Sequence, residues 1–155
     1  MKGNDKIIAV LNELLADELT AISQYMVHSE MCDNWKYEKL AKVVEERAIV
    51  EMKHAEKHIA RILFLEGVPI VSKLNKINIG ASVEEQLKND QAAEVDAVKA
   101  YNAGIQLAME VGDGGSRELL EDILEDEEEH LDWLEAQADQ IAQMGIQFYL
   151  SEQVS

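Results

Sequence analysis

The sequence predicts an all-α protein folded as a four-helix bundle. Apolar residues recur at helical spacing over four long stretches, and the residues that break helices are few and clustered. The chain has one proline and eight glycines among 155 residues. This length suits one compact domain with a single core, so we expect residues 1–155 to form one domain without strands or linkers.

Each helix is delimited by its own sequence signals. The second helical stretch ends at Gly67 and Pro69, because proline cannot continue a helix. Ser82 and Glu85 form a capping box that opens the third helix, and the glycines between residues 112 and 115 separate the third helix from the fourth. The expected helices cover residues 6–34, 37–65, 83–111, 116–144 and, as a short fifth helix, 146–154.

The connections predict how the helices are arranged. Four helices of about 30 residues would each be about 45 Å long. The turns within the first pair and within the second pair are short, which favours antiparallel neighbours. The connection from residue 66 to residue 81 is long enough to run the length of the bundle. We therefore expect a long crossover between helices 2 and 3.

Composition and charge restrict the partners. The chain has 14 Lys and Arg residues and 31 Asp and Glu residues, so its net charge is 14 − 31 = −17. Phosphate backbones and anionic membranes repel such a protein, so we expect no nucleic acid and no membrane partner, but small cations instead. Cys32 is the single cysteine, and neither a leader pattern nor a bilayer-spanning apolar run is seen. We expect a cytoplasmic protein.

An internal repeat relates polar residues of the two halves. The differences 94 − 18, 127 − 51 and 130 − 54 all equal 76, and Tyr25 and Tyr101 are related by the same offset. One helix of each half thus carries a lone glutamate, and the next carries Glu-x-x-His. The related pairs are Glu18 and Glu94, Glu51 and Glu127, and His54 and His130.

These six side chains lie on apolar helix faces. Residues three apart share a face, so the glutamate and the histidine of each Glu-x-x-His project together. A single Glu-x-x-His on a charged helix is usually exposed to solvent. Two of them, each at the same separation from a lone glutamate and all on apolar rows, are hard to obtain from surface bias. We expect all six side chains to point into the bundle.

Buried carboxylates need positive charge. Without partners, four carboxylates would be costly to bury and would protonate instead. Arg47 lies one turn from Glu51 and can neutralise only one of them. Two divalent ions balance four carboxylates, and each ion would also receive an imidazole. Mixed oxygen and nitrogen ligands suit iron, manganese or zinc better than calcium or magnesium. The sequence therefore predicts a dinuclear metal site.

Several motifs around these residues resemble those of the bacterioferritins, and the likeness covers nearly the whole chain. The motifs are Met1–Gly3, Glu51–Ala55, Arg61–Gly67, Asn78–Gly80 and Asp126–Glu128 followed by His130 and Trp133. The resemblance implies a ferritin-like bundle with a di-iron centre. It implies Glu51 and Glu127 as bridges, Glu18 and His54 for one iron, and Glu94 and His130 for the other. Tyr25 is then a hydrogen-bonding or redox-active neighbour.

Met52 lies on a second apolar stripe that points away from the metal row. The stripe residues are Ile49, Met52, Ala55, Ile59 and Leu63 in the second helix and Leu15, Leu19, Ile22 and Met26 in the first. Helices with two apolar faces imply a subunit interface. Taken alone, Met52 is a packing methionine. The resemblance instead implies that it is the axial ligand of a b-type haem shared by two subunits across a two-fold axis.

The resemblance also implies a function, iron storage and detoxification. As a ferroxidase, the protein would oxidise Fe(II) to Fe(III) with oxygen or hydrogen peroxide and store the product as a mineral in a hollow shell of twenty-four subunits. A small ferredoxin would be the partner for iron release. Some relatives carry an extra inner-surface iron site where this chain has Glu46 and Val50, so we expect a different route into the cavity.

Two other functions remain open. A rubrerythrin-like peroxidase would use the same di-iron centre without storing iron, but the chain lacks the Cys-x-x-Cys pair of the rubredoxin-type site usual in that family. A mainly structural or haem-binding cage subunit would not need the complete ligand set. Both alternatives are therefore less favoured than storage.

Overall fold

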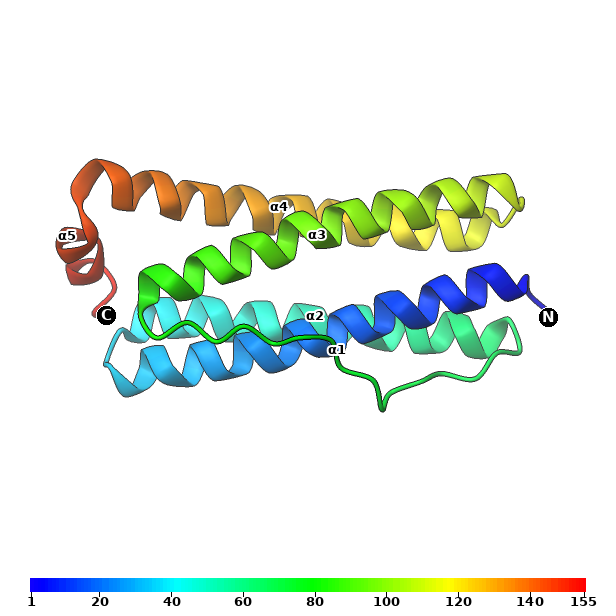
Figure 1. Ribbon diagram of the computed structural model, residues 1–155, viewed down its shortest axis with the longest axis horizontal. Helices are drawn as coiled ribbons and strands as arrows, with labels where there is room; N and C mark the ends of the chain where they lie inside the picture. The colour runs from blue at the N-terminus through cyan, green and yellow to red at the C-terminus, as the bar shows by residue number, and fades with distance from the viewer.

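The computed structural model describes residues 1–155 and contains helices but no strands. The helices are α1 (Asp5–Asn34), α2 (Glu38–Phe64), α3 (Val83–Glu110), α4 (Gly114–Met144) and α5 (Ile146–Ser151). Figure 1 shows the four long helices side by side, with the short α5 at one end. The predicted all-α fold is confirmed. None of the helices combines the length and the apolarity that crossing a membrane requires.

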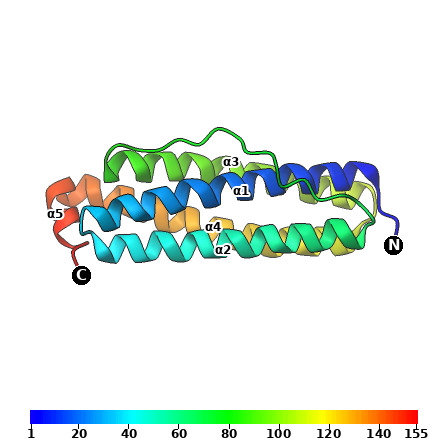
Figure 2. The ribbon, with the colours of Figure 1, turned by 90° about the horizontal axis from the view of Figure 1, so that it is seen from below.

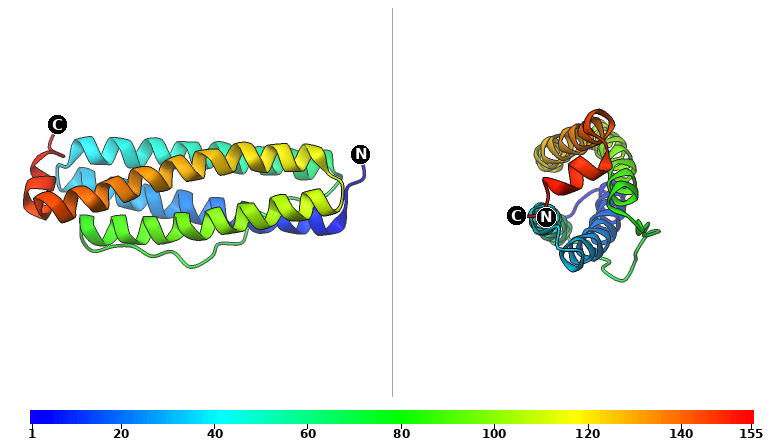
Figure 3. Two further views of the ribbon diagram at one scale, coloured as in Figure 1. Left: turned by 90° about the horizontal axis from the view of Figure 1, so that it is seen from above. Right: turned by 90° about the vertical axis from the view of Figure 1, so that its left-hand side faces the viewer.

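The bundle consists of two helix pairs. α1 packs mainly against α2, and α3 packs mainly against α4, while α1 also contacts α3 (Figure 1). The end-on view in Figure 3 shows the four long helices around a common centre. The crossover, residues 65–82, runs from the end of α2 to the start of α3 along the outside of α1 and α3 (Figures 1 and 2). The predicted connection between helices 2 and 3 is therefore present.

Two helix ends differ by more than one residue from those expected. α4 begins at Gly114, two residues early, because the carboxylate of Asp113 accepts a hydrogen bond from the backbone N–H of Ser116 at 3.0 Å and caps the helix. Gly114 and Gly115 therefore belong to the first turn of α4 rather than to the preceding turn. At the other end of the fold, α5 ends at Ser151 rather than at residue 154.

The start of α3 carries the predicted capping box. Ser82 Oγ accepts a hydrogen bond from the N–H of Glu85 at 3.2 Å, and Glu85 Oε2 accepts one from the N–H of Ala81 at 2.8 Å. The glutamate thus reaches one residue beyond the N-cap, and two backbone donors are satisfied. Gly80 is confined by α3, since a Cβ there would lie 2.3 Å from the backbone nitrogen of Gln86.

A buried polar network holds the end of the crossover. The N–H groups of Gly80 and Asn78 donate to His28 Nε2 and Gln24 Oε1, each at 3.1 Å. Because His28 Nε2 accepts, Nδ1 carries the proton and donates to Asp90 Oδ1 at 2.9 Å. The same oxygen accepts from Gln24 Nε2 at 2.8 Å. These contacts tie the crossover to both α1 and α3.

The apolar core is divided into two clusters. One cluster surrounds the first half of α1: Ile7, Leu11, Leu14, Leu15, Ala55, Ile62, Leu65, Tyr101, Ala108, Leu120 and Ile123. The other surrounds the second half: Tyr25, Cys32, Leu40, Ala41, Val44, Ala48, Val83, Leu87, Leu134 and Tyr149. The six residues of the internal repeat lie between the two clusters along every helix, so a polar section interrupts the core at mid-length.

Candidate metal centre

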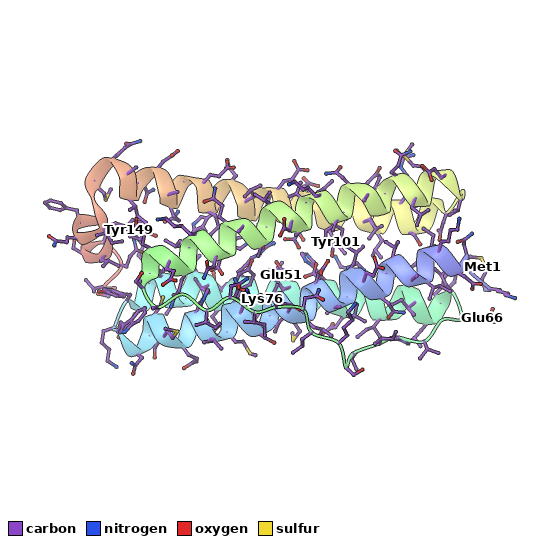
Figure 4. The ribbon with its side chains drawn as sticks, viewed as in Figure 1. Met1, Glu51, Glu66, Lys76, Tyr101 and Tyr149 are labelled. Atoms are coloured by element: carbon purple, nitrogen blue, oxygen red, sulfur yellow. The ribbon has the colours of Figure 1, made fainter.

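The six residues of the internal repeat meet in the middle of the bundle. They are Glu18 on α1, Glu51 and His54 on α2, Glu94 on α3, and Glu127 and His130 on α4. Five of them are at most 3% exposed, and His130 is partly buried. Figure 4 labels Glu51 near the middle of the bundle. The inward orientation expected from the helical rows is what the structure shows.

Their ligand atoms form two adjacent groups. The first group contains Glu18, Glu51, His54 and Glu127, and the second contains Glu51, Glu94 and His130. Within each group the atoms lie within 4.8 Å of one another, which is close enough for a single cation to contact all of them. Glu51 belongs to both groups and is placed to bridge two ions. Glu127 belongs only to the first.

The carboxylate oxygens provide a test of whether a metal fits. Each of the four glutamates has one buried oxygen that accepts no hydrogen bond: Glu18 Oε2, Glu51 Oε1, Glu94 Oε2 and Glu127 Oε1. Glu51 Oε1 does lie 2.8 Å from the Arg47 guanidinium, which is a charge contact without hydrogen-bond geometry. Buried charge without partners is strongly unfavourable. The donor set therefore fits multivalent cations, and its mixed oxygen and nitrogen atoms suit iron, manganese or zinc.

Two tyrosines hold the other oxygens of the lone glutamates. Tyr25 on α1 donates a hydrogen bond to Glu94 Oε1 on α3, and Tyr101 on α3 donates one to Glu18 Oε1 on α1. Tyr101 also lies 2.7 Å from His58 Nε2, which must donate because the phenol proton is committed to Glu18. The two tyrosine donors are 76 residues apart, and so are the two glutamate acceptors. In the sequence this offset relates Tyr101 to Tyr25 but does not predict which residue Tyr101 contacts.

Asp126 is a further residue at the centre that sequence reasoning missed. Its Oδ2 lies 2.8 Å from His54 Nε2, whereas His54 Nδ1 faces the carboxylates of the first group. A carboxylate behind a histidine fixes the tautomer and the ring orientation of a metal ligand. The residue that corresponds to Asp126 in the other half is Val50, so His130 has no such partner. The internal repeat offered a signal for Asp126, because positions 50 and 126 correspond and only position 126 holds a carboxylate.

Burial and crowding shift the pKa values of the centre. Burial raises the pKa of Glu51 to about 7 and that of Glu94 to about 8, and neighbouring glutamates add to both shifts. Burial lowers the pKa of His54, but the adjacent carboxylates of Glu127, Glu18 and Glu51 favour the charged imidazolium, outweigh this and raise the pKa to about 12. Without a cation, the centre therefore holds protons that a bound metal would displace.

A cavity of about 230 Å³ leads to the centre between α1 and α3. Its buried walls include Glu51 and Tyr101, and its exposed lining includes Asn75 and Lys76 of the crossover. Figure 4 shows Lys76 on the crossover, outside the helices that carry Glu51 and Tyr101. A small ion can therefore approach the carboxylates from the side that the crossover covers.

Comparisons with known proteins agree with this architecture. The family model of the ferritin-like domain matches residues 8–144. The chain is 46% identical over 147 residues to the bacterioferritin of Rhodobacter capsulatus, covering 95% of this chain and 91% of that protein. It is 40% identical over 155 residues to bacterioferritin BfrA of Mycobacterium tuberculosis, covering 100% and 98%. It is 40% identical over 149 residues to the bacterioferritin of Brucella melitensis, covering 96% and 92%.

The fold and the centre together define a class of protein, the carboxylate-rich four-helix bundles of ferritin type. The chain belongs to the ferritin-like family and, within it, to the bacterioferritins. The family expected from the sequence motifs is confirmed, and membership supports iron storage as the general function.

Proposed function

We propose that the protein oxidises Fe(II) at the two adjacent ligand groups and stores the product. The observation that carries this proposal is that each of four buried glutamates has an oxygen that accepts no hydrogen bond, beside two imidazoles. Glu18 and His54 would hold one ion, Glu94 and His130 would hold the other, and Glu51 would bridge them. Glu127 would share in the bridge once its second oxygen is released from Arg47.

The reaction removes one electron from each Fe(II). The two electrons from one pair of ions reduce one hydrogen peroxide to two hydroxide ions or, with two protons, reduce one oxygen molecule to hydrogen peroxide. The ionised glutamates favour the more highly charged product, since Coulombic attraction grows with the charge of the ion. Burial raises the pKa of Tyr25 well above its ordinary value, so the phenol stays protonated and keeps Glu94 oriented.

The outer face of α2 supports a haem and a subunit interface. Met52 is 44% exposed beside Ile49, which is 43% exposed, and Met26 on α1 is 52% exposed. Leu15 and Ala55 of the same stripes pack in the subunit's own core instead. We propose Met52 as the axial ligand of a b-type haem at a two-fold interface in a twenty-four-subunit shell. A thioether ligand tends to raise the haem potential, which suits exchange of electrons with a small ferredoxin.

Replacement of Glu18 tests the ferroxidase proposal. Glu18→Ala removes one ligand of the first group. The initial oxidation of Fe(II) should slow by about tenfold or more, because even the loss of a residue that only hydrogen-bonds to a metal ligand costs about tenfold. Stopped-flow absorbance after mixing with Fe(II) measures it. Glu13→Ala, on the exposed face of the same helix, is the matched control and should match the unmodified protein. Equal rates for both variants would contradict the proposal.

Iron loading separates storage from a peroxidase role. The purified protein is given increasing Fe(II) in air, separated by size-exclusion chromatography and analysed for iron. Storage predicts a shell-sized particle that retains far more than two irons per subunit. A small oligomer that saturates at two irons per subunit would support the peroxidase alternative.

A further inference from the structure

Arg47 places a permanent positive charge inside the candidate metal centre. Its Nη2 lies 2.8 Å from Glu51 Oε1 and 2.9 Å from Glu127 Oε2, and its Nη1 donates to the backbone carbonyl of Asp126 at 3.2 Å. The Arg47 side chain is only 11% exposed. The guanidinium therefore joins α2 to α4 through two of the glutamates that face the ligand groups.

The guanidinium and the first ligand group use different oxygens of these glutamates. Glu51 Oε2 and Glu127 Oε1 lie 3.3 Å and 3.2 Å from His54 Nδ1, so they belong to the first group. Glu51 Oε1 and Glu127 Oε2, which face Arg47, are the oxygens left for a second ion. Glu127 is not a member of the second group, which consists of Glu51, Glu94 and His130.

The net charge of the centre also depends on Arg47. Four ionised glutamates and one arginine sum to −4 + 1 = −3, and two divalent ions bring the total to −3 + 4 = +1. Without the arginine the same two ions would give a neutral centre. Arginine does not lose its proton in proteins, so this charge cannot be removed by titration. The residue that corresponds to Arg47 in the other half is Ile123, so the charge breaks the two-fold repeat.

We infer that Arg47 occupies the bridging oxygens in place of a second metal ion, so the two groups fill in sequence. The first divalent ion binds at Glu18 and His54 with Arg47 in position. The second ion must displace the guanidinium from Glu51 and Glu127. This inference rests on the proposed function, since it concerns the same metal centre.

Redox-inert metals test the order of filling without catalysis. The assembled, metal-free protein is titrated with Co(II) by absorbance and with Zn(II) by calorimetry. In the unmodified protein the second binding step should be about 10- to 100-fold weaker than the first, the range set by one contact between charged groups. Arg47→Gln should strengthen the second step by that factor and leave the first within about threefold.

Two control variants separate charge from packing. Arg47→Lys keeps the positive charge and should keep a weak second step. Arg117→Gln removes a surface arginine on α4, whose side chain is 47% exposed, and should change neither step. If the unmodified protein and Arg47→Gln bind two ions with equal affinity, the inference fails while the metal centre stands. If no variant binds Co(II), both the inference and the proposed function fail.

Crystals of the unmodified protein provide a measurement that does not depend on how Arg47→Gln folds. Crystals are soaked in graded Co(II), and anomalous maps are calculated at each concentration. Low Co(II) should give one peak at Glu18 and His54 with Arg47 in place. A second peak should appear only at higher concentration, together with movement of the guanidinium. Equal occupancy of both positions at every concentration would overturn the inference.

Discussion

Replacement of Tyr101 by phenylalanine removes one hydroxyl that satisfies two buried groups. The hydroxyl donates to Glu18 Oε1 and lies 2.7 Å from His58 Nε2. His58 is 0% exposed and does not line the cavity between α1 and α3, so water cannot replace the partner that it loses. A buried donor or acceptor left unsatisfied costs about 1–3 kcal/mol, and a charged one costs more. We expect Tyr101→Phe to lower the free energy of unfolding by about 3 kcal/mol.

Tyr25→Phe provides the matched comparison. It removes the corresponding hydrogen bond to Glu94 Oε1, but His130 Nδ1 lies 2.8 Å from the same oxygen and still satisfies it. The expected loss is therefore about 1 kcal/mol, the value of an ordinary hydrogen bond. The difference of about 2 kcal/mol corresponds to about 4–8 °C in melting temperature for a chain of this size.

Differential scanning calorimetry of the metal-free proteins at pH 8 measures this difference. Size-exclusion chromatography first establishes that both variants assemble like the unmodified protein, because association changes the apparent stability. Equal melting temperatures for the two variants, or a lower one for Tyr25→Phe, would refute the reasoning from unsatisfied buried groups.

Three further predictions concern the same centre and the outer face of α2. Asp126→Ala removes the acceptor behind His54 and should weaken Co(II) binding by about 10- to 100-fold; an unchanged titration would exclude a positioning role. Burial raises the pKa of Glu51 to about 7 and of Glu94 to about 8, from 4.5. The folded metal-free protein thus binds protons that the unfolded chain has released, so acidification from pH 8 to pH 6 should raise its melting temperature. With saturating Zn(II) the sign should reverse, because the ion needs both carboxylates deprotonated; parallel pH profiles with and without Zn(II) would count against this. Met52→Leu should abolish haem absorbance and leave Fe(II) oxidation intact, and retained haem would show that another residue ligates it.

Much of the architecture followed from the sequence, because helical periodicity determines which residues share a face. The offset of 76 between Glu18 and Glu94 singled out a set of residues that the structure brings together at mid-length. The offset identified these residues because the two members of each pair occupy equivalent positions on corresponding helices of the two halves. The start of α4 was misplaced, since a cap by Asp113 depends on a local backbone geometry that the glycines obscure.

The contacts that the sequence did not reveal depend on the register between helices far apart in the chain. Arg47 and Glu127 are 80 residues apart, and His54 and Asp126 are 72 apart. Periodicity shows that each side chain faces inward, but not which neighbour it meets. The sequence allowed Arg47 to neutralise one carboxylate, whereas the structure places it between two.

The division of the core has a mechanical consequence for the subunit. At each end of the bundle, close apolar packing holds the helices together whatever the solution contains. At mid-length they are held by ionic contacts, and their strength depends on which cations are available. Amide exchange should therefore slow on metal loading around residue 51 and remain unchanged near residues 11 and 40. The rigidity of the protein itself would then vary with the supply of the ion that it collects.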